Sequence, residues 1–239
     1  MGRSEENAPA AATMNHTPDL SGPSGLVRAF GTAAAAPAGL DLLARELAAF
    51  VPANDQERTD QRFMQSYLAA HPDCLERSSP AHFTCSVWTV DPTVTRTLMV
   101  YHNIYQSWSW IGGHADGCAD LAHVALRELA EETGAVGTLV PGGIYSLEVL
   151  CVNGHEKHGA YVGSHLHLNV TYLAVADPAA PVRVAPDENS AVAWVEMEDA
   201  VARSTEPWLR DRIYRKFIAK LPAVPHTAWA RAGAMPARG

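Results

Sequence analysis

The segment that decides the fold runs from Gly112 to Ala135 and reads GGHADGCADLAHVALRELAEETGA. Its second half, from Asp120 to Thr133, has the apolar spacing of a helix, and Gly134 is the residue type that commonly ends one. On a helical wheel an apolar face forms that should pack against a sheet. Its members are Ala122, Ala125, Leu126 and Leu129.

Three carboxylates, Glu128, Glu131 and Glu132, lie together on the neighbouring face of this helix. Carboxylates this close repel one another, and a hard divalent cation such as Mg²⁺ reverses that cost because it prefers oxygen ligands. Arg127 precedes Glu131 by four residues and can pair with it. A solvated acidic helix face is the alternative reading of the same charges.

The order of residues around the helix decides between these readings. It resembles the Nudix box, G-x5-E-x7-R-E-U-x-E-E-x-G-U, in which U is aliphatic. The step from Gly113 to Arg127 matches, the half-motif RELAEETG at 127–134 is complete, and Ala135 fills the last aliphatic position. The resemblance extends over about 83–220 and implies a MutT-like Nudix hydrolase.

One position departs from the box. Ala119 stands where the motif has its first glutamate, and Asp116 and Asp120 are the nearby acids that could serve in its place. The departure leaves open an altered or lost reaction, so a non-catalytic nucleotide sensor or isomerase-type chemistry on a diphosphate is the alternative function. The position before the glycines is Ile111, and the isomerase motifs are not evident.

The resemblance also assigns roles to residues. It implies that Glu128, Glu131 and Glu132, with the carbonyl of Gly112, hold Mg²⁺ or Mn²⁺. Glu128 and Arg127 are the candidate catalytic residues, Glu128 for orienting or deprotonating the attacking water and Arg127 as a brace. The implied reaction is attack of water on phosphorus in a diphosphate linked to a nucleoside derivative or a related group.

Candidate substrate-binding residues lie outside the box helix. They are His102, Trp110, His114, His167 and Glu188. His165 and His167 alternate along an expected strand and therefore share one face, which is either the cavity or the outside. Trp110 either stacks on a flat substrate group or is buried in the core, and Glu188 is the favoured late acid.

The chain is expected to be α+β, a Nudix α/β/α sandwich with a mixed sheet plus an N-terminal helical extension. We expect a disordered leader at 1–38, the helical extension at 39–78, the Nudix domain at 79–222 and a flexible tail at 223–239. Helices are predicted near 41–50, 54–70, 120–133 and 206–220. Strands are predicted near 82–90, 97–101, 144–152, 165–175 and 192–196.

Composition narrows the function classes. The 239 residues are 47% hydrophobic, which is ample for a core, and carry a formal net charge of −8. The acidic balance disfavours long nucleic acid as a partner and favours a small-molecule diphosphate. No apolar run is long enough to span a membrane, and four scattered cysteines suit a reduced, cytoplasmic protein. A homodimer is possible in such a family.

Overall fold

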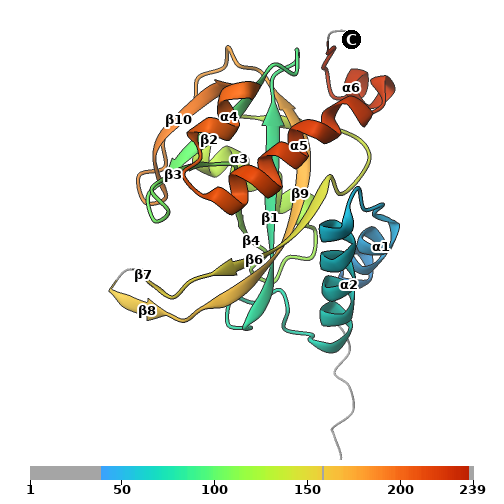
Figure 1. Cartoon of the computed structure of the whole chain (residues 1–239), viewed down its shortest axis with the longest axis vertical. Coiled ribbons are helices and arrows are strands. Elements are labelled where there is room, and N and C mark those ends of the chain that lie inside the picture. The colour runs from blue at the N-terminus through green and yellow to red at the C-terminus, as the bar shows by residue number, and fades with distance from the viewer. Residues whose placement is uncertain (1–38, 158, 237–239) are drawn as a thin grey trace, which may run out of the picture. The chain divides into compact units, whose positions relative to one another are not determined.

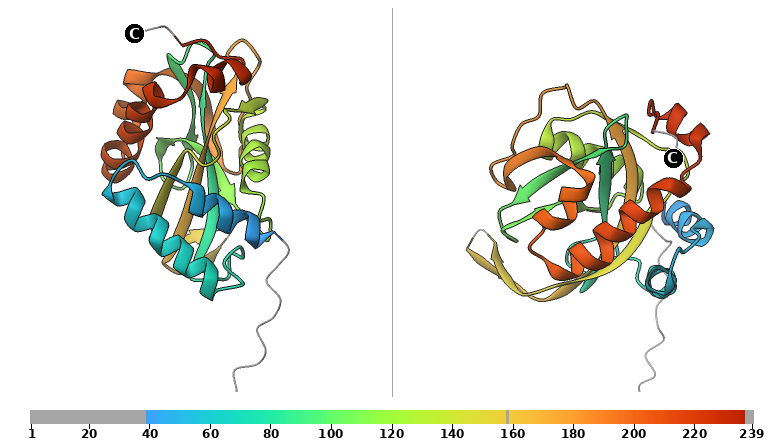
Figure 2. Two further views of the ribbon diagram at one scale, coloured as in Figure 1. Left: turned by 90° about the vertical axis from the view of Figure 1, so that its right-hand side faces the viewer. Right: turned by 45° about the horizontal axis from the view of Figure 1, so that its top comes forward.

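The computed structural model describes residues 39–157 and 159–236. A mixed sheet lies at the centre and helices cover both of its faces, as the edge-on view in Figure 2 shows. This arrangement confirms the expected α+β sandwich. The leader expected at 1–38 lies outside the described residues. Within the described ranges no helix has the length and apolar character to cross a membrane.

The central sheet has the strand order β10-β2-β1-β9-β5, with β3 paired to β2, β4 to β1 and β6 to β9 (Figure 1). Its strands are β1 (Ala81–Val90), β2 (Arg96–His102), β3 (Ser107–Ser109), β4 (Ile111–His114), β5 (Gly137–Leu139), β6 (Ser146–Val152), β9 (His165–Ala176) and β10 (Asn189–Glu196). Strands β1 and β9 run parallel and the other pairs are antiparallel. A separate hairpin joins β7 (His155–Lys157) and β8 (Ala160–Val162).

Two apolar cores form, one on each face of the sheet. Helix α3 (Leu121–Thr133) buries Leu121 and Leu129 in the first. On the other face, α4 (Met197–Arg203), a π-helical turn η1 (Leu209–Tyr214) and α5 (Arg215–Lys220) pack Tyr214 and Phe217 against Trp88 of β1. The sheet is therefore covered on both sides.

The N-terminal helices α1 (Leu40–Ala49) and α2 (Asp55–Ala70) belong to the first core, where Leu47 and Met64 are fully buried. Asn54 caps α2 by accepting the Glu57 N–H at 2.9 Å. Helix α2 lies beside β6, and the Gln56 side chain donates to the Leu147 carbonyl at 2.9 Å. The helices expected near 41–50 and 54–70 are confirmed.

A buried polar network fixes α2 to the sheet and to α5. Glu57 accepts from Lys220 at 2.8 Å and from Ser146 at 2.7 Å. Glu148 of β6 accepts from Lys216 at 2.9 Å. Neither carboxylate is more than 1% exposed. The helical extension is thus joined to the rest of the chain by ion pairs as well as by apolar packing.

The helix expected near 206–220 is present: Pro207 and Trp208 are α-helical, the π-helical η1 follows, and the chain is α-helical again from Arg215. The stretch expected as a flexible tail at 223–239 differs from the expectation, because its described part contains, after the short η2 (Leu221–Ala223), a further helix α6 (His226–Arg231). Its Trp229 is 2% exposed, so apolar burial orders a segment that its composition marks as a tail.

Candidate functional site

Three carboxylates converge where α3 faces the loop before β10. Oxygen atoms of Glu128, Glu132 and Glu188, called here the acidic group, all lie within 4.8 Å of one another. One helical turn separates Glu128 from Glu132, so both project from the same side of α3. Asn189 donates to the Glu132 carbonyl at 3.1 Å, which fixes the Glu188 loop against the helix.

The two glycines of β4 allow the sheet to approach this helix. A Cβ atom at Gly113 would lie 2.4–2.6 Å from the Glu128 carboxylate, and one at Gly112 would lie 2.5 Å from the Cys85 carbonyl. The Gly112 N–H donates to Glu132 Oε1 at 3.0 Å. Any larger residue at either position would displace a carboxylate or the neighbouring strand.

Burial governs the electrostatics of the acidic group. Desolvation raises the pKa of Glu132 to about 8; the hydrogen bond from Gly112 opposes that shift, and the charges of Glu188 and Glu128 add to it. Desolvation also raises the pKa of Glu128, although Arg127 opposes the change. Such carboxylates are costly to ionise without a cation, and a bound cation would offset that cost.

Arg127 holds one of these carboxylates in place. It contacts Glu128 at 2.8 Å and Glu131, one turn further along α3, at 3.8 Å. The Glu131 side chain is 62% exposed and does not join the acidic group. Of the acids expected to bind metal, the structure therefore brings Glu128 and Glu132 together and leaves Glu131 at the rim. The role of the Gly112 carbonyl stays a prediction.

The position of the missing box glutamate is closed to solvent. Ala119 is 8% exposed and lies beside Gly39 at the start of α1. Asp116 forms a two-pronged ion pair with Arg77, at 2.5 and 2.6 Å. Asp120 caps α3 by accepting a backbone N–H at 3.0 Å. Neither aspartate joins the acidic group, and both brace the loop that leads into the helix.

A pocket of about 520 Å³ opens beside the acidic group. Four of the five predicted substrate-binding residues line it, together with Glu132; they are His102, Trp110, His114 and His167. The fifth, Glu188, lies in the acidic group. Trp110 is 8% exposed and edge-on to Tyr214, so it belongs both to the second core and to the pocket wall.

Sequence reasoning missed three residues that line the pocket, namely Tyr105, Glu206 and Trp208. The sequence places Trp208 on the apolar face of a terminal helix, but its side chain is 56% exposed at the pocket. Burial raises the pKa of Glu206, and its Oε1 has no hydrogen-bond partner among the described residues. Trp208 and Ile213 are five residues apart, a spacing that places them on different faces of a helix. This spacing is the feature of the sequence that could have indicated that Trp208 does not point into the core with Ile213.

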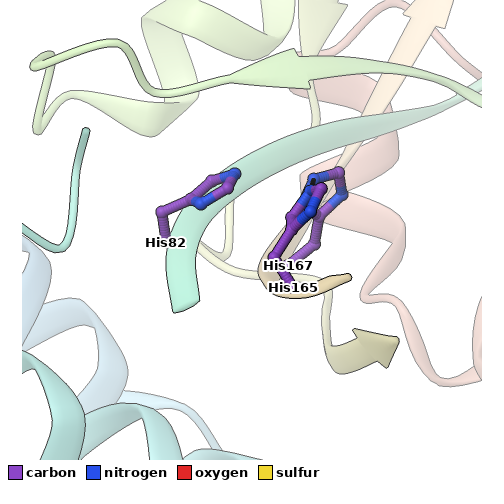
Figure 3. A group of neighbouring side chains, drawn as sticks. All are labelled: His82, His165 and His167. Carbon is purple, nitrogen blue, oxygen red and sulfur yellow. Dashed lines mark hydrogen bonds between the residues drawn. The ribbon is translucent and has the colours of Figure 1, made fainter. Parts of the chain in front are cut away.

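Four histidines lie together, and two of them, His114 and His167, line the pocket. Ring nitrogens of His82, His165 and His167 lie within 4.8 Å of one another (Figure 3). The His114 ring packs against two of them, with ring centroids 5.2 Å from His82 and 4.9 Å from His167. Desolvation lowers the pKa of His167 to about 2 and also lowers that of His82. The sequence predicts that His165 and His167 share one face of their strand. It does not place His82 beside them, because that depends on the order of the strands in the sheet.

Three solved structures show a distant similarity to this chain. A hydrolase of the NUDIX family from Clostridium perfringens is 17% identical, with a TM-score of 0.44, over 60% of this chain and 98% of that one. An Ap4A hydrolase from C. elegans is 21% identical, with a TM-score of 0.42, over 59% and 98%. The E. coli dihydroneopterin triphosphate pyrophosphohydrolase is 15% identical, with a TM-score of 0.45, over 59% and 97%.

A comparison with curated proteins gave no match. The model of the NUDIX domain family matches residues 82–220, which is more than half of the chain and includes the glycines of β4, all of α3 and Glu188. With the box sequence and the mixed sheet, this match identifies the family: the chain belongs to the NUDIX domain family.

Proposed function

We propose that the protein is a Nudix hydrolase that requires Mg²⁺ or Mn²⁺ and cleaves a diphosphate linkage in a small nucleotide derivative or a related compound. One observation carries the proposal: three carboxylates, Glu128, Glu132 and Glu188, meet within 4.8 Å beside a pocket of about 520 Å³. That volume lies in the range of small-molecule sites.

The residues present fit a divalent cation. The donors are carboxylate oxygens, the ligand type that Mg²⁺ and Mn²⁺ prefer. The raised pKa of Glu132 marks a charge that the protein itself leaves under-compensated. Glu128, Glu132 and Glu188 would hold the ion, and Glu131 at the rim could contribute. Bound there, the ion would neutralise charge on the diphosphate and lower the pKa of a water.

The protein residues supply position and proton transfer. Glu128, braced by Arg127 at 2.8 Å, is the proposed base that orients and deprotonates the attacking water. Gly112 and Gly113 line the pocket together with Glu132, where the diphosphate would bind, and His114 can donate to a phosphate oxygen. The exposed Trp208 offers a flat face for a base or another planar group.

The experiment that tests this proposal measures phosphate release, coupled to a phosphatase that hydrolyses the monophosphate products, from a panel of nucleoside diphosphate derivatives, with and without Mg²⁺ or Mn²⁺. We expect metal-dependent turnover that falls by about 10³-fold or more in Glu132→Gln, because a ligand of the ion is lost. Glu198→Gln, which removes an exposed carboxylate of α4, is the matched control and should retain full activity.

The alternative function, a nucleotide sensor or a module with an altered reaction, predicts a different result in this experiment. Metal would bind, yet no panel compound would be cleaved. Ala119 in place of the first box glutamate is the observation that favours it. Isomerase-type chemistry is disfavoured because Ile111 is fully buried in the first core and does not line the pocket.

A further inference from the structure

The histidines lie together because of strand register. In the parallel pair of β1 and β9, His82 is directly opposite His167. His165 lies two residues before His167 on β9, so its side chain is on the same face. Figure 3 shows the three imidazoles, which come from two strands, facing one another. The sheet itself therefore positions the group.

Hydrogen bonds on the far side of two rings fix which nitrogens face inward. His82 Nδ1 contacts the Ser79 carbonyl at 2.8 Å, and His165 Nδ1 contacts the Gly163 carbonyl at 2.8 Å. A carbonyl can only accept, so both Nδ1 atoms carry the proton. In the neutral rings, Nε2 then has a lone pair. An Nδ1–H bonded to a carbonyl is the usual outer support of a metal-binding histidine.

Of those two lone pairs, the one on His82 has no donor in the described part of the chain, and the one on His165 has only the His167 ring. His82 is 2% exposed, and its Nε2 has no hydrogen-bond partner among the described residues. His165 Nε2 lies 3.1 Å from His167 Nε2, so His167 must donate there while no cation is bound. A buried acceptor without a donor is costly, and a cation can satisfy several such acceptors at once.

We propose that His82, His165 and His167 bind a second metal ion, a borderline divalent cation of the Zn²⁺ class, at a site separate from the acidic group. Three imidazole nitrogens suit Zn²⁺, Co²⁺ or Ni²⁺ and are poor ligands for Mg²⁺.

The two sites would select different metals within one pocket. His167 and His114 line the same pocket as Glu132 and Gly112. An ion on the histidines would therefore lie where it could contact an oxygen of the same bound substrate. The oxygen ligands of the acidic group would take Mg²⁺ or Mn²⁺, and the nitrogen ligands the softer ion.

The test measures zinc directly, on the untagged full-length chain stripped of metal. The protein is dialysed against Zn²⁺ in slight molar excess over the chain, with Mg²⁺ in large excess, and its zinc content is determined; Co²⁺ is used in parallel for its visible spectrum. We expect one equivalent of Zn²⁺ per chain, and a Co²⁺ spectrum typical of nitrogen ligands. His165→Gln, at a partly exposed position, should weaken Zn²⁺ binding at least tenfold; we take about tenfold as the least effect of losing a ligand.

Two controls separate this site from the acidic group. His226→Gln removes an exposed histidine of α6 and should leave zinc affinity unchanged, as should Glu132→Gln. His167→Gln provides a second ligand variant, and circular dichroism checks that each variant is folded. Zinc that is absent from the wild type, or that is lost in Glu132→Gln and kept in His165→Gln, would overturn the proposal. Because the readout is bound zinc, its result is independent of whether hydrolysis is found.

Discussion

Among the described residues, buried glutamates lie in two regions, and their surroundings are opposite. In the network between α2, β6 and α5, Glu57 and Glu148 face Lys216 and Lys220 at 2.8–3.5 Å. In the acidic group, Glu128, Glu132 and Glu188 share one arginine, Arg127, which contacts only Glu128 of the three. The first region contains its own cations and the second contains an excess of anions.

The pKa values follow this difference. Burial alone would raise the pKa of Glu57, but the hydrogen bond and charge of Lys220 outweigh it and hold the pKa below the ordinary value. Burial raises the pKa of Glu132 to about 8, and its neighbouring carboxylates reinforce the shift. Carboxylates that are buried to a similar extent thus form a structural ion pair at Glu57 and a site that requires an external cation at Glu132.

The largest expected change in the free energy of unfolding comes from removing a lysine of the network between α2, β6 and α5. Lys216→Met removes a buried cation that contacts both Glu57 and Glu148 while keeping a similar side-chain length. Leaving a buried charge without its partner costs about 3–5 kcal/mol. Urea denaturation should show a loss of that order. An unchanged midpoint would mean that the network does not stabilise the fold.

Metal binding should stabilise the protein through the acidic group alone. A ligand at 100 times its dissociation constant stabilises the folded state by about 2.7 kcal/mol. We therefore expect Mg²⁺ or Mn²⁺ to raise the melting temperature of the wild type and of Glu198→Gln, and to have no effect on Glu132→Gln. A shift that persists in Glu132→Gln would place the binding ion elsewhere.

When metal is absent, replacing a glutamate by glutamine should change the free energy of unfolding in opposite directions in the two regions. Glu57→Gln removes a paired charge and should destabilise the fold by about 2–4 kcal/mol. Glu132→Gln removes a carboxylate that is costly to ionise, so at pH 7 it should stabilise the metal-free protein by about 1–3 kcal/mol. Denaturation in the presence of EDTA measures both, and equal signs would contradict the comparison.

The sequence predicts these two regions unequally. The box helix, its caps and Glu128 with Glu132 follow from local spacing, since a helical turn determines which side chains share a face. Glu188 was favoured only by resemblance, and His82 joins His167 only through the pairing of β1 with β9. The Glu57 network was not predicted, because its partners are 68 to 163 residues apart in the chain.

Lowering the pH should change the free energy of unfolding by a smaller amount. Glu57 has a lowered pKa in the folded state, so its contribution to stability is complete above about pH 4.5 and is lost as the pH falls through its folded pKa. Between pH 6 and pH 3, Glu57→Gln should therefore lose less stability than the wild type, by roughly 1.4 kcal/mol for each unit of pKa shift. Glu198→Gln should follow the wild type, and a parallel slope in Glu57→Gln would argue against the ion pair.

The smallest effect belongs to an ion pair on the surface of the same helix. Arg58 lies 3.5 Å from Asp55, with the two side chains 50% and 101% exposed. Water and salt screen such a pair, and most of them contribute nothing measurable to stability. Arg58→Met should leave the urea midpoint unchanged at both low and high salt, whereas Lys216→Met shifts it strongly. Since both substitutions replace a cation that pairs with an acid of α2 by methionine, a large loss in Arg58→Met would mean that burial is not what distinguishes the two pairs.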